Sequence, residues 1–238
     1  MPQPHHRALL VQARNETPLL RHLVLEAPLA ARAGHRLPGQ FVEVAVRPDG
    51  PGAYFALANP PGAHHFELLV KQGEGVAAQL ASLGAGRSVW ISTPMGPGFP
   101  IDAARGKDVL LFATGSGFAP IRALLFALLE RRDDYGDIHL FFGVRREEDF
   151  PFREELERLP ARGVHTHLTV SRRLAALPDE EGAGRNGHAR YVQERFREVL
   201  PPVENAVAFL CGIEGMVHGV REALAEAGME PADIHVNL

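Results

Sequence analysis

The chain has 238 residues, of which 45% are hydrophobic, and a formal net charge of −4. This length and composition suit one large or two ordinary packed domains and exclude a disordered chain. Because basic residues are interspersed with acidic ones, neither nucleic acid nor an anionic membrane is expected as a partner. The single cysteine, Cys211, excludes an internal disulfide and any all-cysteine iron–sulfur or zinc site.

The first hundred residues contain short alternating segments punctuated by Gly and Pro, a spacing typical of an antiparallel barrel or sandwich. One helix-like segment interrupts them at 75–83, with Val76, Leu80 and Leu83 on one face. The predicted strands are 7–13, 19–26, 40–46, 54–58, 65–71 and 88–93.

The pattern changes near residue 105, where strand-like and helix-like segments begin to alternate. Such alternation predicts a parallel, doubly wound sheet. The segment 174–187, rich in Gly, Pro and acidic residues, is predicted to be a loop. The predicted strands are 109–113, 138–144, 164–170 and 206–211, and the predicted helices are 121–130, 152–159, 192–199 and 216–227.

Signals for targeting and for metal binding are sparse. No apolar run approaches the ~18 residues that span a bilayer, and the first residues lack the apolar core of a signal peptide. We therefore expect a cytoplasmic protein. Most of the twelve histidines are scattered, and the pairs His5-His6 and His64-His65 lie in polar or Gly- and Pro-flanked stretches. We expect these pairs to be solvent-exposed, and we predict no metal site.

A candidate nucleotide-binding turn follows the apolar strand 109–113. Thr114-Gly115-Ser116-Gly117 forms a tight turn before a helix that starts near Pro120. Glycine lets the backbone lie close to a ligand, and the free amides at a helix start attract a pyrophosphate. The full Gly-x-Gly-x-x-Gly pattern is not satisfied, so an ordinary strand-to-helix turn without a ligand is the alternative.

Short segments in both predicted domains resemble, in their order, the ferredoxin–NADP reductase family, and most of all its branch of plant and bacterial pKIWI502-type proteins. The resemblance covers nearly the whole chain. The matching segments are PGQFV (38–42), FALANPP (55–61), GEGVA (73–77), PMGPGF (94–99), TGSGFAP (114–120), GVR (143–145), YVQ (191–193) and CGIEGM (211–216).

The resemblance implies an FAD-binding β-barrel at 1–104, followed by an NAD(P)-binding α/β domain at 105–238. It implies an oxidoreductase in which hydride passes from NADPH or NADH to FAD. The electrons would then pass to an unidentified acceptor, either a small redox protein or a small molecule. The alternative is a non-catalytic or partner-dependent nucleotide-binding or electron-relay subunit with a degenerate flavin site.

The flavin site departs from the family's Arg-x-Tyr-Ser pattern, because Ala53-Tyr54-Phe55-Ala56 lacks the arginine and the serine. Phe55 retains a ring that can stack on the isoalloxazine. Losing a charge-assisted phosphate contact of about 1.5–3 kcal/mol predicts weaker FAD retention, with FMN or an empty site as alternatives. The resemblance assigns these residues to the flavin: Tyr54, Phe55, Ala56, Leu57, Ala58, Asn59, Gly73, Gly75, Val76, Ala77 and Leu238.

Two of these flavin segments carry alternatives. The glycine-rich turn at 73–77 enters the predicted helix, where its amides could hold the flavin phosphates or could form a plain helix cap. Leu238 ends the chain where many relatives have an aromatic residue over the second flavin face. Leucine cannot stack in that way, so either the ring is more exposed or a different residue covers it.

The resemblance places Cys211 near the reacting atoms, where it positions the reactants without acting as a nucleophile, because the flavin carries the redox chemistry. A small buried residue at a strand end is the alternative.

The segment after the predicted strand 164–170 bears on the choice of coenzyme. NADPH is favoured by Ser171 and Arg172, together with Arg190-Tyr191, because arginine suits the 2′-phosphate. The alternative is a solvated basic loop that binds no coenzyme. The residues assigned to the coenzyme are Thr114, Gly115, Ser116, Gly117, Arg145, Ser171, Arg172, Tyr191, Gly212 and Met216.

Overall fold

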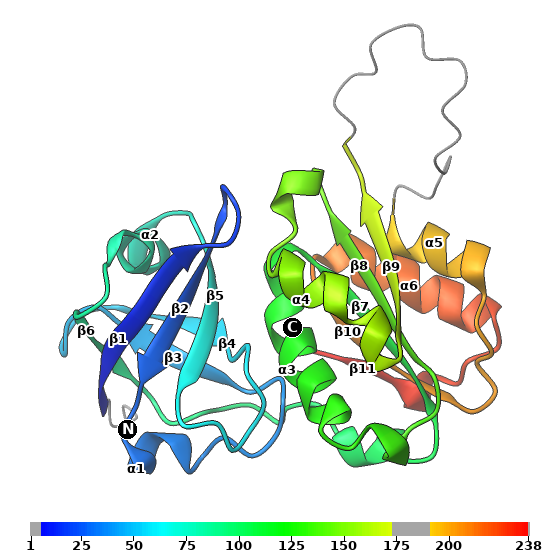
Figure 1. The fold of residues 1–238 in the computed structure, drawn as a ribbon, viewed down its shortest axis with the longest axis horizontal. Coiled ribbons are helices and arrows are strands. Elements are labelled where there is room, and N and C mark those ends of the chain that lie inside the picture. The colour runs from blue at the N-terminus through cyan, green and yellow to red at the C-terminus, as the bar shows by residue number, and fades with distance from the viewer. Residues whose placement is uncertain (1–5, 173–190, 238) are drawn as a thin grey trace, which may run out of the picture.

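In the computed structural model, which describes residues 6–172 and 191–237, the chain forms two β-sheets (Figure 1). The first sheet is antiparallel, with the strand order β4-β3-β6-β1-β2-β5. It curls into a barrel, because the chain just after β4 pairs with β5 through a bridge between Leu57 and Leu68. Its strands are β1 (His6–Asn15), β2 (Leu20–Glu26), β3 (Phe41–Ala45), β4 (Gly52–Ala56), β5 (Phe66–Lys71) and β6 (Ser88–Ile91).

The barrel encloses its own apolar core. Inward-facing residues such as Leu10, Leu23 and Val44 are fully buried, as the alternation of side chains along a strand requires. The helix α2 (Gly75–Ser82) adds Val76 and Leu80 to this core. A single helical turn, α1 (Leu29–Arg32), follows β2 and was not predicted.

The second sheet is parallel, with the strand order β11-β10-β7-β8-β9. Its strands are β7 (Asp108–Thr114), β8 (Ile138–Val144), β9 (Val164–Val170), β10 (Ala206–Cys211) and β11 (Ile234–Val236). The accompanying helices are α3 (Phe118–Leu129), α4 (Arg153–Arg158), α5 (Val192–Val199) and α6 (Glu214–Glu226).

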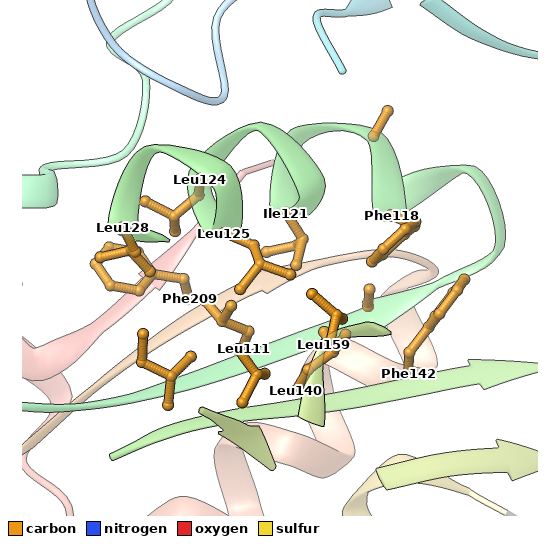
Figure 2. Packing of buried hydrophobic residues seen from close by; sticks show 14 of the residues in the cluster. Leu111, Phe118, Ile121, Leu124, Leu125, Leu128, Leu140, Phe142, Leu159 and Phe209 are labelled. Atoms are coloured by element: carbon orange, nitrogen blue, oxygen red, sulfur yellow. The ribbon is translucent and has the colours of Figure 1, made fainter. Parts of the chain in front are cut away.

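Helices cover both faces of the parallel sheet, so its central strands are apolar without alternation. On one face, α3 and α4 pack against Leu111 and Phe142, and the rings of Phe118 and Phe142 stack at 4.3 Å (Figure 2). On the other face, α5 and α6 pack against Phe112 and Phe141. Barrel residues, including Leu20 and Leu69, belong to the same buried cluster as α3, so apolar contacts join the two sheets.

The predicted fold class is confirmed, and the strand predictions lie within a few residues of the observed ends. β11 was missed because three residues carry no usable pattern. The helix α3 begins at Phe118, before the predicted start, because the 3₁₀ turn Gly115–Gly117 runs directly into it. The predicted loop 174–187 lies outside the described residues. Within the described ranges, no helix has the length and apolar character needed to cross a bilayer.

Candidate active site

The turn between β7 and α3 lies at the carboxyl edge of the parallel sheet, where open α/β folds bind ligands. In the described part of the chain, no side chain caps the start of α3. Gly115 has a φ of +54°, and, apart from its chain neighbours, no described residue has an atom within 4 Å of the position that a Cβ would take there. The predicted turn residues therefore leave backbone amides and open space for a ligand. Strand β5 of the barrel contacts this turn.

A second turn, between β10 and α6, packs directly against the first. A Cβ on Gly117 would lie 2.5 Å from the carbonyl oxygen of Cys211, and one on Gly212 would lie 2.1 Å from Oγ1 of Thr114. The backbone N–H of Ile213 donates to that hydroxyl at 3.1 Å. Gly117 and Gly212 are therefore needed for the close approach of two turns, a reason that the sequence pattern did not reveal.

Cys211 ends β10 and pairs in register with Ala113 of β7. Its side chain is half-buried and packs against the core under α3. Burial raises the pKa of the Cys211 thiol to about 12, so the group stays protonated at neutral pH. A protonated thiol is a poor nucleophile. This state is compatible with a positioning role, which remains a prediction.

The chain after Asn237 is not described, so Leu238 lies outside the described residues. Asn237 itself was not predicted to matter. Its amide Nδ2 donates to the carbonyl of Gly39 in the barrel at 2.6 Å, and its N–H donates to Leu210 of β10 at 3.0 Å. Asn237 therefore ties the end of β10 to the barrel, one residue before Cys211.

The carboxyl ends of β8 and β9 bring two predicted coenzyme residues together. The N–H of Arg172 donates to the carbonyl of Arg145 at 2.7 Å, and both residues are exposed. Ser171 continues the strand pairing through its N–H to Val144 at 3.0 Å. Tyr191 is exposed at the start of α5. Two exposed arginines therefore lie side by side at this edge of the sheet. Arg190 lies outside the described residues.

The same edge contains a buried hydroxyl that sequence reasoning missed. Oγ1 of Thr169 is buried and has no hydrogen-bond partner among the described residues. It lies 3.0 Å from the position of a Cβ on Gly143. An orphaned polar atom beside a glycine fits a polar ligand group at this place. Met216, also predicted here, is buried, and its methyl group lies 2.6 Å from a Cβ on Gly212.

On the barrel side, β4 separates its two aromatic residues because successive side chains point to opposite faces. Phe55 and Ala53 pack against the barrel core, and Phe55 is half-buried. Tyr54 is 66% exposed, and its ring meets that of Phe41 edge-on at 5.6 Å. Of the two predicted rings, Tyr54 presents the more accessible face.

The turn into α2 is open. Outside its own helix and chain neighbours, no atom of the described residues lies within 4 Å of a Cβ position on Gly75, which has a φ of +60°. A Cβ on Gly73 would meet the backbone oxygen of Lys71 at 3.9 Å. Among the residues that the structure describes, no side chain caps the start of α2, although the exposed Glu74 occupies the N-cap position. Val76 and Ala77 instead face the barrel core. The open backbone of this turn suits phosphate oxygens, whereas the negative charge of Glu74 opposes them.

Three other predicted flavin residues follow β4, and one of them, Ala58, packs in the cluster that contains α3. Leu57, Ala58 and Asn59 are buried. Side-chain Oδ1 of Asn59 accepts the backbone N–H of Glu67 at 2.7 Å, and its Nδ2 donates to the carbonyls of Pro60 and His65 at 3.1 Å. The side chain of Asn59 thus closes the loop between β4 and β5.

A buried ion cluster links the two sheets beside this loop. Arg122 of α3 binds Glu155 through two hydrogen bonds of 2.7 and 2.8 Å, and donates to Glu67 of β5 at 2.9 Å. It also donates to the carbonyl of Ala58 at 2.6 Å. Burial alone would raise the pKa of Glu67, but the hydrogen bond from His22 and the charge of Arg122 lower it to about 2. Arg122 is the one charged residue in an otherwise apolar helix, a signal that sequence reasoning overlooked.

Known proteins resemble this chain in sequence. Residues 111–222 match the family model described as the oxidoreductase NAD-binding domain. Ferredoxin–NADP reductase B of Sorangium cellulosum is 32% identical over 96% of this chain and 95% of its own length. The sulfhydrogenase 1 gamma subunit of Pyrococcus furiosus is 29% identical over 98% of this chain and 78% of its own length.

Solved structures share the fold. A Neisseria gonorrhoeae ferredoxin NADP⁺ reductase, solved with FAD and NADP, aligns over 98% of this chain and 99% of its own, with a TM-score of 0.76 and 19% identity. An Amycolatopsis cytochrome P450 reductase aligns over 100% of this chain and 71% of its own, with a TM-score of 0.78 and 24% identity.

The chain combines a β-barrel with a parallel α/β sheet and has these relatives. Together they define a two-domain flavin-dependent NAD(P)H oxidoreductase that passes electrons to an acceptor. The chain belongs to the ferredoxin–NADP reductase family. The predicted family and enzyme class are therefore confirmed.

Proposed function

We propose that this protein oxidises NADPH at the carboxyl edge of the parallel sheet, with FAD held against the barrel. The observation that carries the proposal is the open turn at Gly115, whose amides no side chain caps, beside the end of β10 at Cys211. Thr114 holds the two turns together through Ile213. When bound, FAD supplies a centre that takes up electrons in a pair and releases them singly or in pairs.

The preference for NADPH rests on Arg145 and Arg172. Their backbones are joined at 2.7 Å and both residues are exposed, so two guanidinium groups are available to one phosphate. Ser171 lies beside them, and Tyr191 offers an exposed ring for an adenine.

The barrel binds FAD more weakly than an arginine-containing barrel would. Ala53 cannot donate to a phosphate and packs against the core. The supporting groups are the ring of Tyr54 for stacking and the amides of the turn at Gly73 and Gly75 for phosphate oxygens.

The experiment is an absorbance spectrum of gently purified protein, followed by anaerobic titration with NADPH and then NADH after FAD has been added. We expect a flavin band that NADPH bleaches at lower concentration than NADH does. A colourless protein that binds neither FAD nor FMN and oxidises neither coenzyme would overturn the proposal. Equal titration curves for the two coenzymes would overturn only the NADPH preference.

A second candidate function is an electron-relay subunit of a larger enzyme. It is favoured by the similarity over 98% of the chain to a sulfhydrogenase gamma subunit and by the missing flavin arginine at Ala53. The two candidates differ in what the isolated chain does. A free-standing reductase turns over NADPH with a soluble dye as acceptor, whereas a relay subunit does so only after its partner is added.

The acceptor is proposed to be a separate small redox protein or a small molecule. The proposed location is the cytoplasm, because the one cysteine, Cys211, is a free thiol of the kind that reducing compartments maintain.

A further inference from the structure

Three histidines and an aspartate gather at the opposite end of the parallel sheet from the redox site. His139 is the second residue of β8, and it pairs in register with His165, the second residue of β9. His167 follows two positions later and therefore lies on the same face of the sheet. Asp137 immediately precedes β8. This cluster was not predicted, because its members come from two strands that only the sheet register brings together.

The atoms of this cluster lie at distances suited to a shared ligand. One ligand atom each from Asp137, His139 and His165 lies within 4.8 Å of the others. Nε2 of His165 lies 3.9 Å from Oδ1 of Asp137. Two nitrogens bound to one tetrahedral Zn²⁺ are about 3.3 Å apart, given Zn–N bonds of about 2.0–2.1 Å. Because Asp137 and His165 are exposed, rotation of their side chains can close the remaining gap.

The neighbouring groups hold the cluster in place. Nδ1 of His139 is 3.1 Å from Nε2 of His167, a hydrogen bond that orients the His139 ring. A metal-binding histidine ordinarily has such a partner on its other nitrogen. The carboxylate of Asp108 accepts the N–H of Asp137 at 2.7 Å. Arg195 of α5 acts electrostatically on His167, and its charge is offset by an ion pair with Glu198 at 3.0 Å.

We propose that Asp137, His139 and His165 form a binding site for a divalent transition metal such as Zn²⁺, with His167 as the positioning residue of His139. Imidazole and carboxylate are the ligands that Zn²⁺ takes, and three protein ligands leave a fourth position for water. The bound ion joins the edge strand β9 to β8 at their amino ends. It lies at the far end of these strands from Arg145 and Ser171, so it is a site separate from the coenzyme edge.

The rival explanation is aromatic stacking without a metal. His139 stacks with His165 at 4.6 Å, and His167 stacks on Phe141 at 4.4 Å, which continues the ring packing beneath α5. Stacking, however, does not require the carboxylate of Asp137. Removing that carboxylate therefore distinguishes the two explanations. A metal site loses affinity for its ion, whereas ring stacking alone predicts no change in metal binding.

The experiment measures Zn²⁺ binding by chelator-treated protein, in competition with a chromophoric chelator, and counts the metal retained after gel filtration. The test variants are Asp137→Asn and His165→Ala, whose side chains are 68% and 55% exposed and can change without opening the core. The matched control is His218→Ala on α6, which is 76% exposed. His5→Ala/His6→Ala removes the adjacent histidine pair near the N-terminus.

We expect one Zn²⁺ per chain in the wild type and in both controls, and at least a tenfold loss of affinity in each test variant. Co²⁺ in place of Zn²⁺ should show the intense visible bands of a tetrahedral site, and both test variants should lose them. The proposal is wrong if the wild type retains no Zn²⁺ through gel filtration. It is equally wrong if the test variants bind as tightly as the wild type, which would indicate adventitious binding only.

Discussion

Arg122 and Glu67 form a buried ion pair between the two sheets, with Nη1 2.9 Å from Oε2. Arg122 lies on α3, directly after the open turn at Gly115, and Glu67 lies on β5, which contacts that turn. The pair therefore sets how the coenzyme edge meets the barrel. The guanidinium also lies over the ring of Phe152 at 4.4 Å, so it is enclosed by polar and aromatic groups alike.

Replacing this arginine should destabilise the protein strongly. Arg122→Ala leaves Glu67 and Glu155 without their cation, and breaking a buried pair costs about 3–5 kcal/mol. Arg122→Lys should lose less stability, because it keeps the positive charge. It should still lose some, because lysine cannot make the paired hydrogen bonds to Glu155. Urea unfolding measures both. Arg105→Ala is the control, since its ion pairs are exposed to solvent, which screens them, and should contribute little to stability. Equal losses in Arg122→Ala and Arg105→Ala would contradict the argument.

Two glycines near the contact between the turns should respond to alanine substitution in opposite ways. Gly117→Ala places a Cβ 2.5 Å from the backbone of Cys211, so the turns must separate, and we expect a loss of coenzyme binding and of about 1–3 kcal/mol of stability. Gly215→Ala, in the first turn of α6, places a Cβ that meets no described residue beyond its own helix within 4 Å, so it should stabilise by about 0.5–1 kcal/mol. Thermal unfolding and NADPH titration test the pair. Similar results for the two variants would show that turn packing is not the reason for Gly117.

Cys211 should behave as a protonated thiol. With its pKa raised to about 12 by burial, its thiolate fraction at pH 8 is about a thousandfold below that of a thiol with a pKa of 9. We expect slow reaction with Ellman's reagent in the folded protein and rapid reaction in urea. Cys211→Ser should lower the rate of flavin reduction without adding a pH dependence between pH 6 and 9. Fast labelling of the folded protein would contradict the burial argument.

His35 should make the protein less stable in mild acid. Burial lowers its pKa from 6.5 to about 4, so the unfolded chain binds a proton at pH 5 that the folded chain does not. The free energy of unfolding is unaffected by this titration above pH 6.5. It falls as the pH drops toward 4, and the loss is roughly 2 kcal/mol at pH 5. His35→Gln should therefore lose less stability between pH 7 and pH 5 in urea unfolding. His218→Gln, at an exposed site, should retain the wild-type slope. The same slope in both variants would exclude His35 as the cause.

The coenzyme preference should depend on Arg172. Removing a charge-assisted contact of about 1.5–3 kcal/mol predicts a rise of roughly 10- to 100-fold in KM for NADPH in Arg172→Ala, with little change for NADH. Steady-state kinetics with both coenzymes measure this. Arg158→Ala on α4 is the control, since its side chain is 74% exposed and forms an exposed ion pair with Glu154 at 3.5 Å. A parallel rise in KM for both coenzymes would show that Arg172 does not contact the 2′-phosphate.

Local patterns were sufficient for most of the fold. Strand β7 was predicted because its five central residues are apolar, and all five are buried under helices on both faces. The turn at Gly115 was predicted because glycine and a following helix are adjacent in the chain. β11 was not, because three residues next to a helix are too few for a period, and their strand exists only through pairing with β10.

The order of strands and helices, the two kinds of sheet and the family could be predicted from the amino-acid sequence, because alternation and short motifs depend on neighbouring residues. The folded chain was needed to show why Gly117 and Gly212 must be glycine, which carboxylates hold Arg122, and that Asp137 and His139 meet His165. These relations depend on sheet register and on how α3 lies against β5. Such contacts join residues far apart in the chain, and no periodicity along the sequence records them.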